Sequence, residues 1–244
     1  MMSSFQIFSS EDIEITTQIE KNYQDIQRAI SAAAVQAGRD PQEVLLVAVS
    51  KTVGIPEVQS ALEAGIHDFG GNRSKLFLEK QQSFLQERWH FIGHLQTNKL
   101  KDLVGRASLI HSVASKHAVE VISKLALERE TDQSVLIEVN VSGEESKGGA
   151  TAKEVPELLE VASNLRGITV KGLMTMAPIL RSEHDSAARS TFASLRELRD
   201  NLVPNYANAK NISFNELSMG MSDDFEDAVK EGATIVRIGR KLWS

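Results

Sequence analysis

The chain has 244 residues, of which 41% are hydrophobic and 25% are charged, a balance typical of a folded globular protein. Its net charge of −6, with both signs mixed along the chain, argues against a nucleic-acid-binding surface, and no apolar run approaches the ~20 residues that span a bilayer. The absence of cysteine excludes disulfides, thiolate catalysis and cysteine-based zinc sites.

Apolar side chains recur at spacings of three and four between residues 10 and 37, which predicts a long amphipathic helix. Residues 1–9 lack this pattern and are predicted as a flexible N-terminal segment. They also contain no Lys or Arg and no long apolar run, so we predict no signal peptide, no membrane association and a cytoplasmic location.

After this helix, predicted strands and helices alternate to the end of the chain. The eight strands cover residues 44–52, 66–69, 89–92, 108–111, 134–141, 168–174, 212–217 and 233–238. The helices between them cover residues 56–64, 74–86, 98–104, 116–129, 152–164, 186–202 and 223–231. This alternation implies an α/β protein with parallel strands, and eight strands favour one closed (β/α)8 TIM barrel. Residues 10–244 are therefore predicted as a single domain, with the N-terminal helix covering the gap after the last strand.

The predicted strand at 44–52 is rich in Val and Leu but ends in a lysine. Because side chains alternate along a strand, Lys51 is predicted to share the inward face with Val47 and Val49 and to emerge at the carboxyl end of the barrel. Burial disfavours the ammonium form of a lysine, and a neutral amine can attack an aldehyde to form a Schiff base. The alternative is a lysine that merely reaches solvent.

The loops after the seventh and eighth predicted strands often form a phosphate site in such barrels. They contain Met219, Ser222, Gly239 and Arg240. Ser222 is predicted to offer its hydroxyl to a phosphate and to cap the helix at 223–231. In the alternative, Ser222 is only a helix cap.

Arg237 alternates with Val236 and Ile238 and is predicted to point into the barrel mouth. There its guanidinium could donate a hydrogen bond to a pyridine nitrogen. Because arginine keeps its proton, that nitrogen would stay unprotonated and the ring would be a poorer electron sink. The alternative is an ion pair with Glu138 of a neighbouring strand.

Two further patterns predict no ligand site. His90 and His94 are four residues apart on a strand rather than a helix, so we predict satisfied polar contacts and no metal. The run at 143–149 lacks the spacing of a phosphate loop, and its acidic residues argue against nucleotide binding.

Several motifs together resemble the pyridoxal phosphate homeostasis protein family, whose barrel is similar to the N-terminal domain of bacterial alanine racemases. The matching segments are LLVAVSKT around Lys51, FGGN ending at Asn72, WHFIGHLQTNK at 89–99, VNVSGEESKGG at 139–149, KGLMTMAP at 171–178 and LSMGMSDDFEDAVKEGATIVRIGR at 217–240. The resemblance implies pyridoxal 5′-phosphate as the cofactor and Lys51 as its Schiff-base lysine. It also implies Ser222, Gly239 and Arg240 at the phosphate, Arg237 at the pyridine nitrogen and Asn72 beside the cofactor.

The sequence departs from the family pattern at a few positions. It has Gly71 in place of Glu, Arg73 in place of Tyr, Ala114 in place of Asp, and Trp243-Ser244 in place of a C-terminal Phe-Gly. These departures leave the finer contacts around the ring open.

A racemase of this barrel type uses a second base, a tyrosine from a separate domain of the partner subunit, and this chain has no room for such a domain. Its tyrosines are Tyr23, in the first helix, and Tyr206, before the seventh strand, and neither is a convincing base. We therefore predict a monomeric, non-enzymatic protein that holds pyridoxal phosphate, supports vitamin B6 and amino-acid balance, and has apo-enzymes as candidate recipients. The alternatives are a racemase or lyase of low activity that uses the same Schiff base, and a barrel enzyme for a phosphorylated sugar with Lys51 as its base.

Overall fold

A computed structural model describes residues 10–141, 143, 148–178 and 186–244. The predicted flexible segment, residues 1–9, lies outside the described residues, and so does part of the loop at 139–149.

The elements follow the predicted alternation. The strands are β1 (Leu45–Val49), β2 (Asp68–Gly71), β3 (Arg88–Phe91), β4 (Leu109–Val113), β5 (Gln133–Asn140), β6 (Ala150–Thr151), β7 (Ile168–Met174), β8 (Ile212–Ser218) and β9 (Ile235–Ile238). The α-helices are α1 (Ser10–Gln36), α2 (Ile55–Glu63), α3 (Ser74–Ser83), α4 (Leu100–Leu103), α5 (Lys116–Glu128), α6 (Val155–Ser163), α7 (Ala187–Leu202), α8 (Phe225–Lys230) and α9 (Arg240–Trp243). Short 3-10 turns cover η1 (Pro41–Glu43), η2 (Thr97–Lys99) and η3 (Val203–Tyr206).

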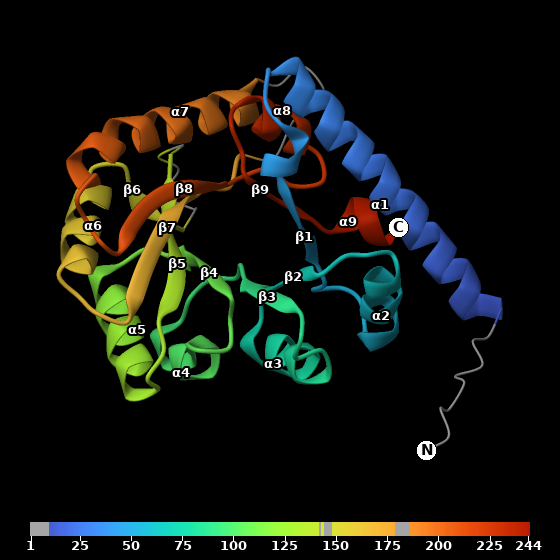
Figure 1. The fold of residues 1–244 in the computed structure, drawn as a ribbon, viewed down its shortest axis with the longest axis horizontal. Helices are drawn as coiled ribbons and strands as arrows, with labels where there is room; N and C mark the ends of the chain where they lie inside the picture. The colour runs from blue at the N-terminus through green and yellow to red at the C-terminus, as the bar shows by residue number, and fades with distance from the viewer. Residues whose placement is uncertain (1–9, 142, 144–147, 179–185) are drawn as a thin grey trace.

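Eight parallel strands of the described chain close into a barrel (Figure 1). Their order around the ring is β1, β2, β3, β4, β5, β7, β8 and β9, and the pairing of β9 with β1 closes the ring. The short strand β6 pairs with the end of β5 outside this ring. The predicted TIM-barrel fold is therefore confirmed.

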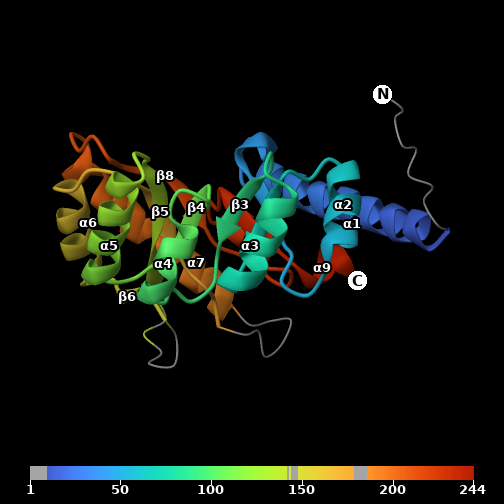
Figure 2. The same ribbon diagram turned by 90° about the horizontal axis from the view of Figure 1, so that it is seen from below.

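The N-terminal helix α1 packs against the end of the ring of helices. It contacts α2 and α8, and α9 lies beside it near the C-terminus in both views (Figures 1 and 2). Ile19, Ile26 and Ile30 of α1 are buried against the core. This helix occupies the predicted position beside the eighth strand, with the unpredicted four-residue α9 next to it.

The structure corrects two predicted boundaries near the candidate site. β1 ends at Val49, two residues before Lys51, so the predicted strand at 44–52 is too long. The helix α8 begins at Phe225 instead of residue 223, with Asp224 in the capping position. No side chain in the described chain caps this helix, so the predicted cap by Ser222 is wrong. Asp224 Oδ1 accepts a hydrogen bond from the N–H of Met221, which lies before the helix, at 2.5 Å.

The barrel interior is layered. Leu45, Val47, Leu109, Leu136, Met174 and Ile235 form an apolar cluster. Two residues farther along their strands, Leu109 is followed by His111, Leu136 by Glu138 and Ile235 by Arg237, and these three polar residues are all buried. Because alternate residues of a strand share a face, the polar side chains form a second layer toward the carboxyl ends of the strands. This polar layer is the floor of the candidate site.

Candidate functional site

Lys51 lies in the turn that follows β1, and its side chain is exposed. The interpretation that burial in the barrel activates this lysine is therefore wrong, and the alternative, a lysine that reaches solvent, describes its position. The chain leaves the sheet here because side chains bond the carbonyls at the strand end: Trp243 Nε1 donates to the Val49 carbonyl at 2.8 Å, and Lys80 Nζ donates to the Ser50 carbonyl. Lys80 Nζ also donates to the Val53 carbonyl at 2.7 Å, on the other side of Lys51.

Lys80 is a site residue that sequence reasoning missed. Its side chain is buried, and burial lowers the pKa of its ammonium although the carboxylates of Glu57 and Glu79 act in the opposite direction. A signal was present in the sequence, because Lys80 lies three residues after Phe77 and four before Phe84, in the apolar stripe of α3. A lysine in such a stripe needs buried carbonyl acceptors.

Arg237 points into the barrel, as its place in the strand predicts. It is buried, its Nη1 donates to Ser218 Oγ at 2.7 Å, and its Nη2 donates to the Thr175 carbonyl at 2.9 Å. Burial lowers the pKa of its guanidinium to about 10, while Asp224 and Glu138 act in the opposite direction. Arg237 therefore stays charged at neutral pH and keeps further N–H donors for a ligand.

The alternative ion pair with Glu138 does not form in the described chain, where the acceptors of Arg237 are a hydroxyl and a carbonyl. Glu138 is itself buried, and its burial raises the pKa of its carboxyl, an effect that the charges of Arg237 and His94 reduce. Glu138 therefore acts on Arg237 through its charge, without a hydrogen bond to the guanidinium among the described residues.

The loops after β8 and β9 lie side by side. Ser222 Oγ accepts a hydrogen bond from the Lys241 N–H at 3.3 Å, which ties the two loops together. The Arg240 guanidinium forms an exposed ion pair with Asp223. The Met219 side chain is buried in the outer core, and its N–H donates to the Ile235 carbonyl, so only its backbone carbonyl remains for a ligand.

The register of the strands brings the remaining candidates to the same end of the barrel. Val47 pairs with Arg237 and Ala48 with Ile238, so the turn with Lys51 and the residue Gly239 leave neighbouring strands together. On the other side, Val49 pairs with Gly70, two residues before the half-buried Asn72.

Gly239 tests whether this end of the barrel fits a phosphate. A Cβ added at Gly239 would lie 3.5 Å from the Val49 Cβ, an ordinary contact, and its backbone is not in the left-handed region. By contrast, a Cβ at Gly220 would lie 2.6 Å from the Ala228 Cβ, and its φ is +91°. Packing explains the glycine at 220 but not at 239, which fits an open backbone that a phosphate can approach closely.

The two histidines have different surroundings. His90 is buried and contacts Asp68 and His111, which agrees with the predicted satisfied polar contacts, while His94 is exposed. Within the described residues, no group of three or more His, Asp or Glu side chains is arranged to hold a metal ion.

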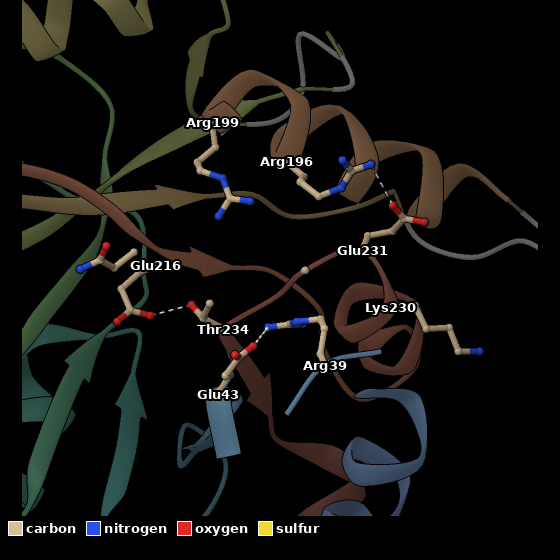
Figure 3. Close-up of a pocket in the computed structure, with 10 residues that line it drawn as sticks. Arg39, Glu43, Arg196, Arg199, Glu216, Lys230, Glu231 and Thr234 are labelled. Carbon is tan, nitrogen blue, oxygen red and sulfur yellow. Dashed lines mark hydrogen bonds and ion pairs between the residues drawn. The ribbon is translucent and has the colours of Figure 1, made fainter. Parts of the chain in front are cut away.

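A pocket of about 600 Å³ lies away from these residues, between α7, the middle of β8 and the residues just before β9 (Figure 3). Arg39 donates to the carbonyls of Val229 and Ala233, Glu231 pairs with Arg196, and Glu216 accepts from Thr234. Because the pocket's acids and bases largely bond one another or the backbone, its lining does not single out a ligand. None of the predicted cofactor residues lines it.

Comparisons with known proteins agree with the resemblance in the sequence. The alanine racemase N-terminal domain family model matches residues 16–243. The pyridoxal phosphate homeostasis protein of Aquifex aeolicus is 44% identical over 216 residues, which cover 88% of this chain and 92% of that protein. The chain belongs to the pyridoxal phosphate homeostasis protein family. The family member of Pseudomonas aeruginosa is 39% identical and covers 92% of this chain and 94% of its own length.

Solved structures agree with this membership. An unknown protein from Bifidobacterium adolescentis has a TM-score of 0.88 at 32% identity, with 97% of this chain and 98% of that chain covered. PipY of Synechococcus elongatus, solved with pyridoxal phosphate bound, has a TM-score of 0.79 at 28% identity, with 93% of this chain and 100% of that chain covered. An alanine racemase of Clostridium difficile shares the fold at 14% identity and a TM-score of 0.74, with 93% of this chain but only 56% of that chain covered.

Two departures from the expected pattern of a pyridoxal phosphate homeostasis protein have local explanations. A Cβ at Gly71 would lie 3.1 Å from the Phe77 Cβ, so a glutamate at this position would require Phe77 to move by a few tenths of an ångström. Trp243 is the residue that bonds the Val49 carbonyl, so the unusual C-terminus supports the end of β1.

Proposed function

We propose that this chain binds pyridoxal 5′-phosphate at the carboxyl ends of β1, β8 and β9 and holds it for release, as one barrel domain over residues 10–244. The observation that carries the proposal is the meeting of an exposed lysine, a buried charged arginine and an open glycine at one end of the barrel: Lys51, Arg237 and Gly239. Family membership and the bound ligand in PipY support it. Apo-enzymes that need the cofactor are the proposed recipients.

The chain's own residues divide the binding between them. Arg237 offers guanidinium donors to the pyridine nitrogen, and the loops with Ser222 and Gly239 offer a hydroxyl and an open backbone to the phosphate. When bound, pyridoxal phosphate supplies an aldehyde that condenses with a lysine amine to a Schiff base, with release of one water. Lys51, exposed on a braced turn, is the proposed source of this amine.

The positions of the tyrosines support holding over catalysis. Tyr23 lies in α1, where its hydroxyl accepts a hydrogen bond from Gln27. Tyr206 lies in η3, before β8 begins, and its hydroxyl donates to the Pro156 carbonyl at 3.0 Å. Because η3 precedes β8, Tyr206 is at the opposite end of the barrel from Lys51. Neither tyrosine is positioned as a second base at the proposed site.

The absorption spectrum tests whether Lys51 forms the Schiff base with pyridoxal phosphate. We expect the protein mixed with pyridoxal phosphate to turn yellow, borohydride to abolish the visible band, and peptide mapping to find the reduced adduct on Lys51. Lys51→Ala should lose the band, whereas Lys75→Ala, which removes an exposed lysine of α3, should keep it. An adduct on another lysine in the unmodified protein, or a colourless protein, would overturn the proposal.

Exchange of an amino acid's α-hydrogen for deuterium tests the absence of catalysis. We expect the loaded protein to exchange it no faster than free pyridoxal phosphate does. Sustained racemisation at ~1 per second or faster would favour the alternative, a racemase that uses the same lysine.

The proposal includes a cytoplasmic monomer. The described residues contain no helix long and apolar enough to cross a membrane. Light scattering on the purified protein should give the mass of one chain, and a dimer would contradict this part of the proposal.

A further inference from the structure

A chain of hydrogen bonds crosses the barrel interior from Arg237 to β2. Arg237 Nη1 lies 2.7 Å from Ser218 Oγ, and Ser218 Oγ lies 2.9 Å from His111 Nδ1. His111 Nε2 lies 2.9 Å from His90 Nδ1, and His90 Nε2 lies 3.1 Å from Asp68 Oδ1. All five side chains are buried. We call Asp68, His90, His111 and Ser218 the buried relay.

The hydrogen bonds of the relay allow one consistent assignment of donors and acceptors, which all run in the same direction. Arg237 can only donate, so Ser218 Oγ accepts a hydrogen bond from it and donates its own hydroxyl proton in a hydrogen bond to His111 Nδ1. A neutral His111 then carries its proton on Nε2 and donates to His90 Nδ1, and His90 donates from Nε2 to the Asp68 carboxylate. Every donor thus has an acceptor, with a cation at one end and an anion at the other.

The surrounding charges favour this arrangement. Burial would raise the pKa of Asp68, but hydrogen bonds from His90 and Arg88 outweigh burial and lower it, so the carboxylate stays ionised. Arg88 binds both oxygens of Asp68, at 2.7 and 2.5 Å. Burial, followed by the electrostatic effects of His90 and Arg237, lowers the pKa of His111 well below its usual value, so His111 stays neutral.

Other charged groups face Arg237 rather than the middle of the relay. Glu138 of β5 and Asp224, beside α8, favour its charged form without hydrogen-bonding to it in the described chain. His94 acts on Glu138. Both carboxyl groups therefore favour a positive Arg237, but its direct side-chain partner is Ser218.

We propose that the buried relay positions Arg237: its fixed direction holds Ser218 Oγ as an acceptor, so that the guanidinium keeps its orientation toward the pyridine nitrogen of the bound ligand. This rests on the proposed function. His111 and Ser218 are positioning residues, because they act through Arg237 without touching the ligand.

A ligand that lacks the ring nitrogen separates positioning from general stability. The test compares the Kd of pyridoxal phosphate with that of its deaza analogue, in which a CH group replaces the ring nitrogen. His111→Phe keeps an aromatic ring at this position but breaks the relay. We expect it to raise the Kd of pyridoxal phosphate about tenfold, which corresponds to the loss of one charged hydrogen bond. The Kd of the deaza analogue should change by less than about threefold. Equal weakening of both ligands would mean a structural role and would overturn the proposal.

Ser112→Ala is the matched control. Ser112 is the buried neighbour of His111 on β4, and its hydroxyl donates to the Gly93 carbonyl at 2.6 Å, outside the relay. We expect it to leave the ratio of the two Kd values unchanged. In the background of Arg237→Met, His111→Phe should have no further effect on that ratio, because the residue it positions is gone.

Two measurements keep the proposal testable if His111→Phe does not fold. Ser218→Ala removes the link next to Arg237 and should give the same ligand-selective loss. Nitrogen NMR of the unmodified protein should find His111 neutral with its proton on Nε2, and a proton on Nδ1 would overturn the relay's direction. Failure of the unmodified protein to bind pyridoxal phosphate would refute the proposed function, whereas binding without the selective effect would refute the relay alone.

Discussion

At the scale of single residues, Lys51 depends on partners that lie far from it in the sequence. Its turn is held from α3 by Lys80 and from the C-terminal helix by Trp243, through hydrogen bonds to the backbone carbonyls on either side. Because hydrogen bonds already order the backbone of this turn, the exposed amine can react without a further loss of backbone entropy. The reactive residue is thus prepared by its neighbours in space rather than by burial.

Lys80→Met should loosen this turn while it keeps the apolar stem of the side chain. We expect the Schiff base at Lys51 to form about tenfold more slowly, because the amine must be repositioned. Stopped-flow absorbance after mixing with pyridoxal phosphate measures the rate. Lys75→Met, on the exposed face of the same helix, is the control, and an unchanged rate in Lys80→Met would show that the turn holds itself.

At the scale of elements, α1 contributes to the barrel through one face. Ile26 and Ile30 are buried against the core, and Asn22 Nδ2 donates to the Leu242 carbonyl at 3.0 Å. The helix therefore holds α9, whose Trp243 bonds the end of β1. This contact connects the N-terminal helix to the candidate site.

Ile30→Ala should lower the free energy of unfolding by about 2–4 kcal/mol, because it removes buried methyl groups and leaves a cavity. Urea unfolding followed by circular dichroism measures the change. Val35→Ala is the control on the same helix, since Val35 is 67% exposed, and we expect a change within about 0.5 kcal/mol. A small loss for Ile30→Ala would mean that α1 is not packed as part of the core.

At the scale of the whole molecule, the barrel interior combines an apolar layer with a charged one. Leu109, Leu136 and Ile235 fill the first, and His111, Glu138 and Arg237 follow them in the second. The apolar layer supplies burial, whereas the polar layer is stable only while its hydrogen bonds and ionisation states are maintained. The stability of the fold should therefore depend on pH through this layer.

The unfolding free energy should fall as the pH drops below about 6.5, the usual value for histidine. In the folded chain burial keeps His111 neutral with a lowered pKa, so below pH 6.5 the unfolded chain binds the additional proton and is favoured. The slope from one such group is at most about 1.4 kcal/mol per pH unit. Urea unfolding of the ligand-free protein at several pH values should show a flatter profile for His111→Phe. His117→Gln, at an exposed position, is the matched control. A variant profile parallel to that of the unmodified protein would contradict this assignment.

Much of the architecture could be predicted from local pattern, because a strand or helix repeats its apolar side chains every two or three to four residues wherever it lies in the chain. The strand at Ile168–Met174 was predicted with its observed ends. The two-residue β6 and the four-residue α9 were missed, because they are too short to show a period. The end of β1 was also missed, because bonds from Lys80 and Trp243 determine it.

The sequence by itself determined the kind of fold, the family and the candidate chemical groups of the site, since alternation and motifs are local properties of the chain. Only the tertiary structure decided which partner each buried polar group takes: Arg237 bonds Ser218 instead of pairing with Glu138, and Ser218 meets His111 across 107 residues. The physical reason is that a buried donor must find an acceptor among the groups that barrel closure brings within about 3 Å, and sequence spacing does not specify that set.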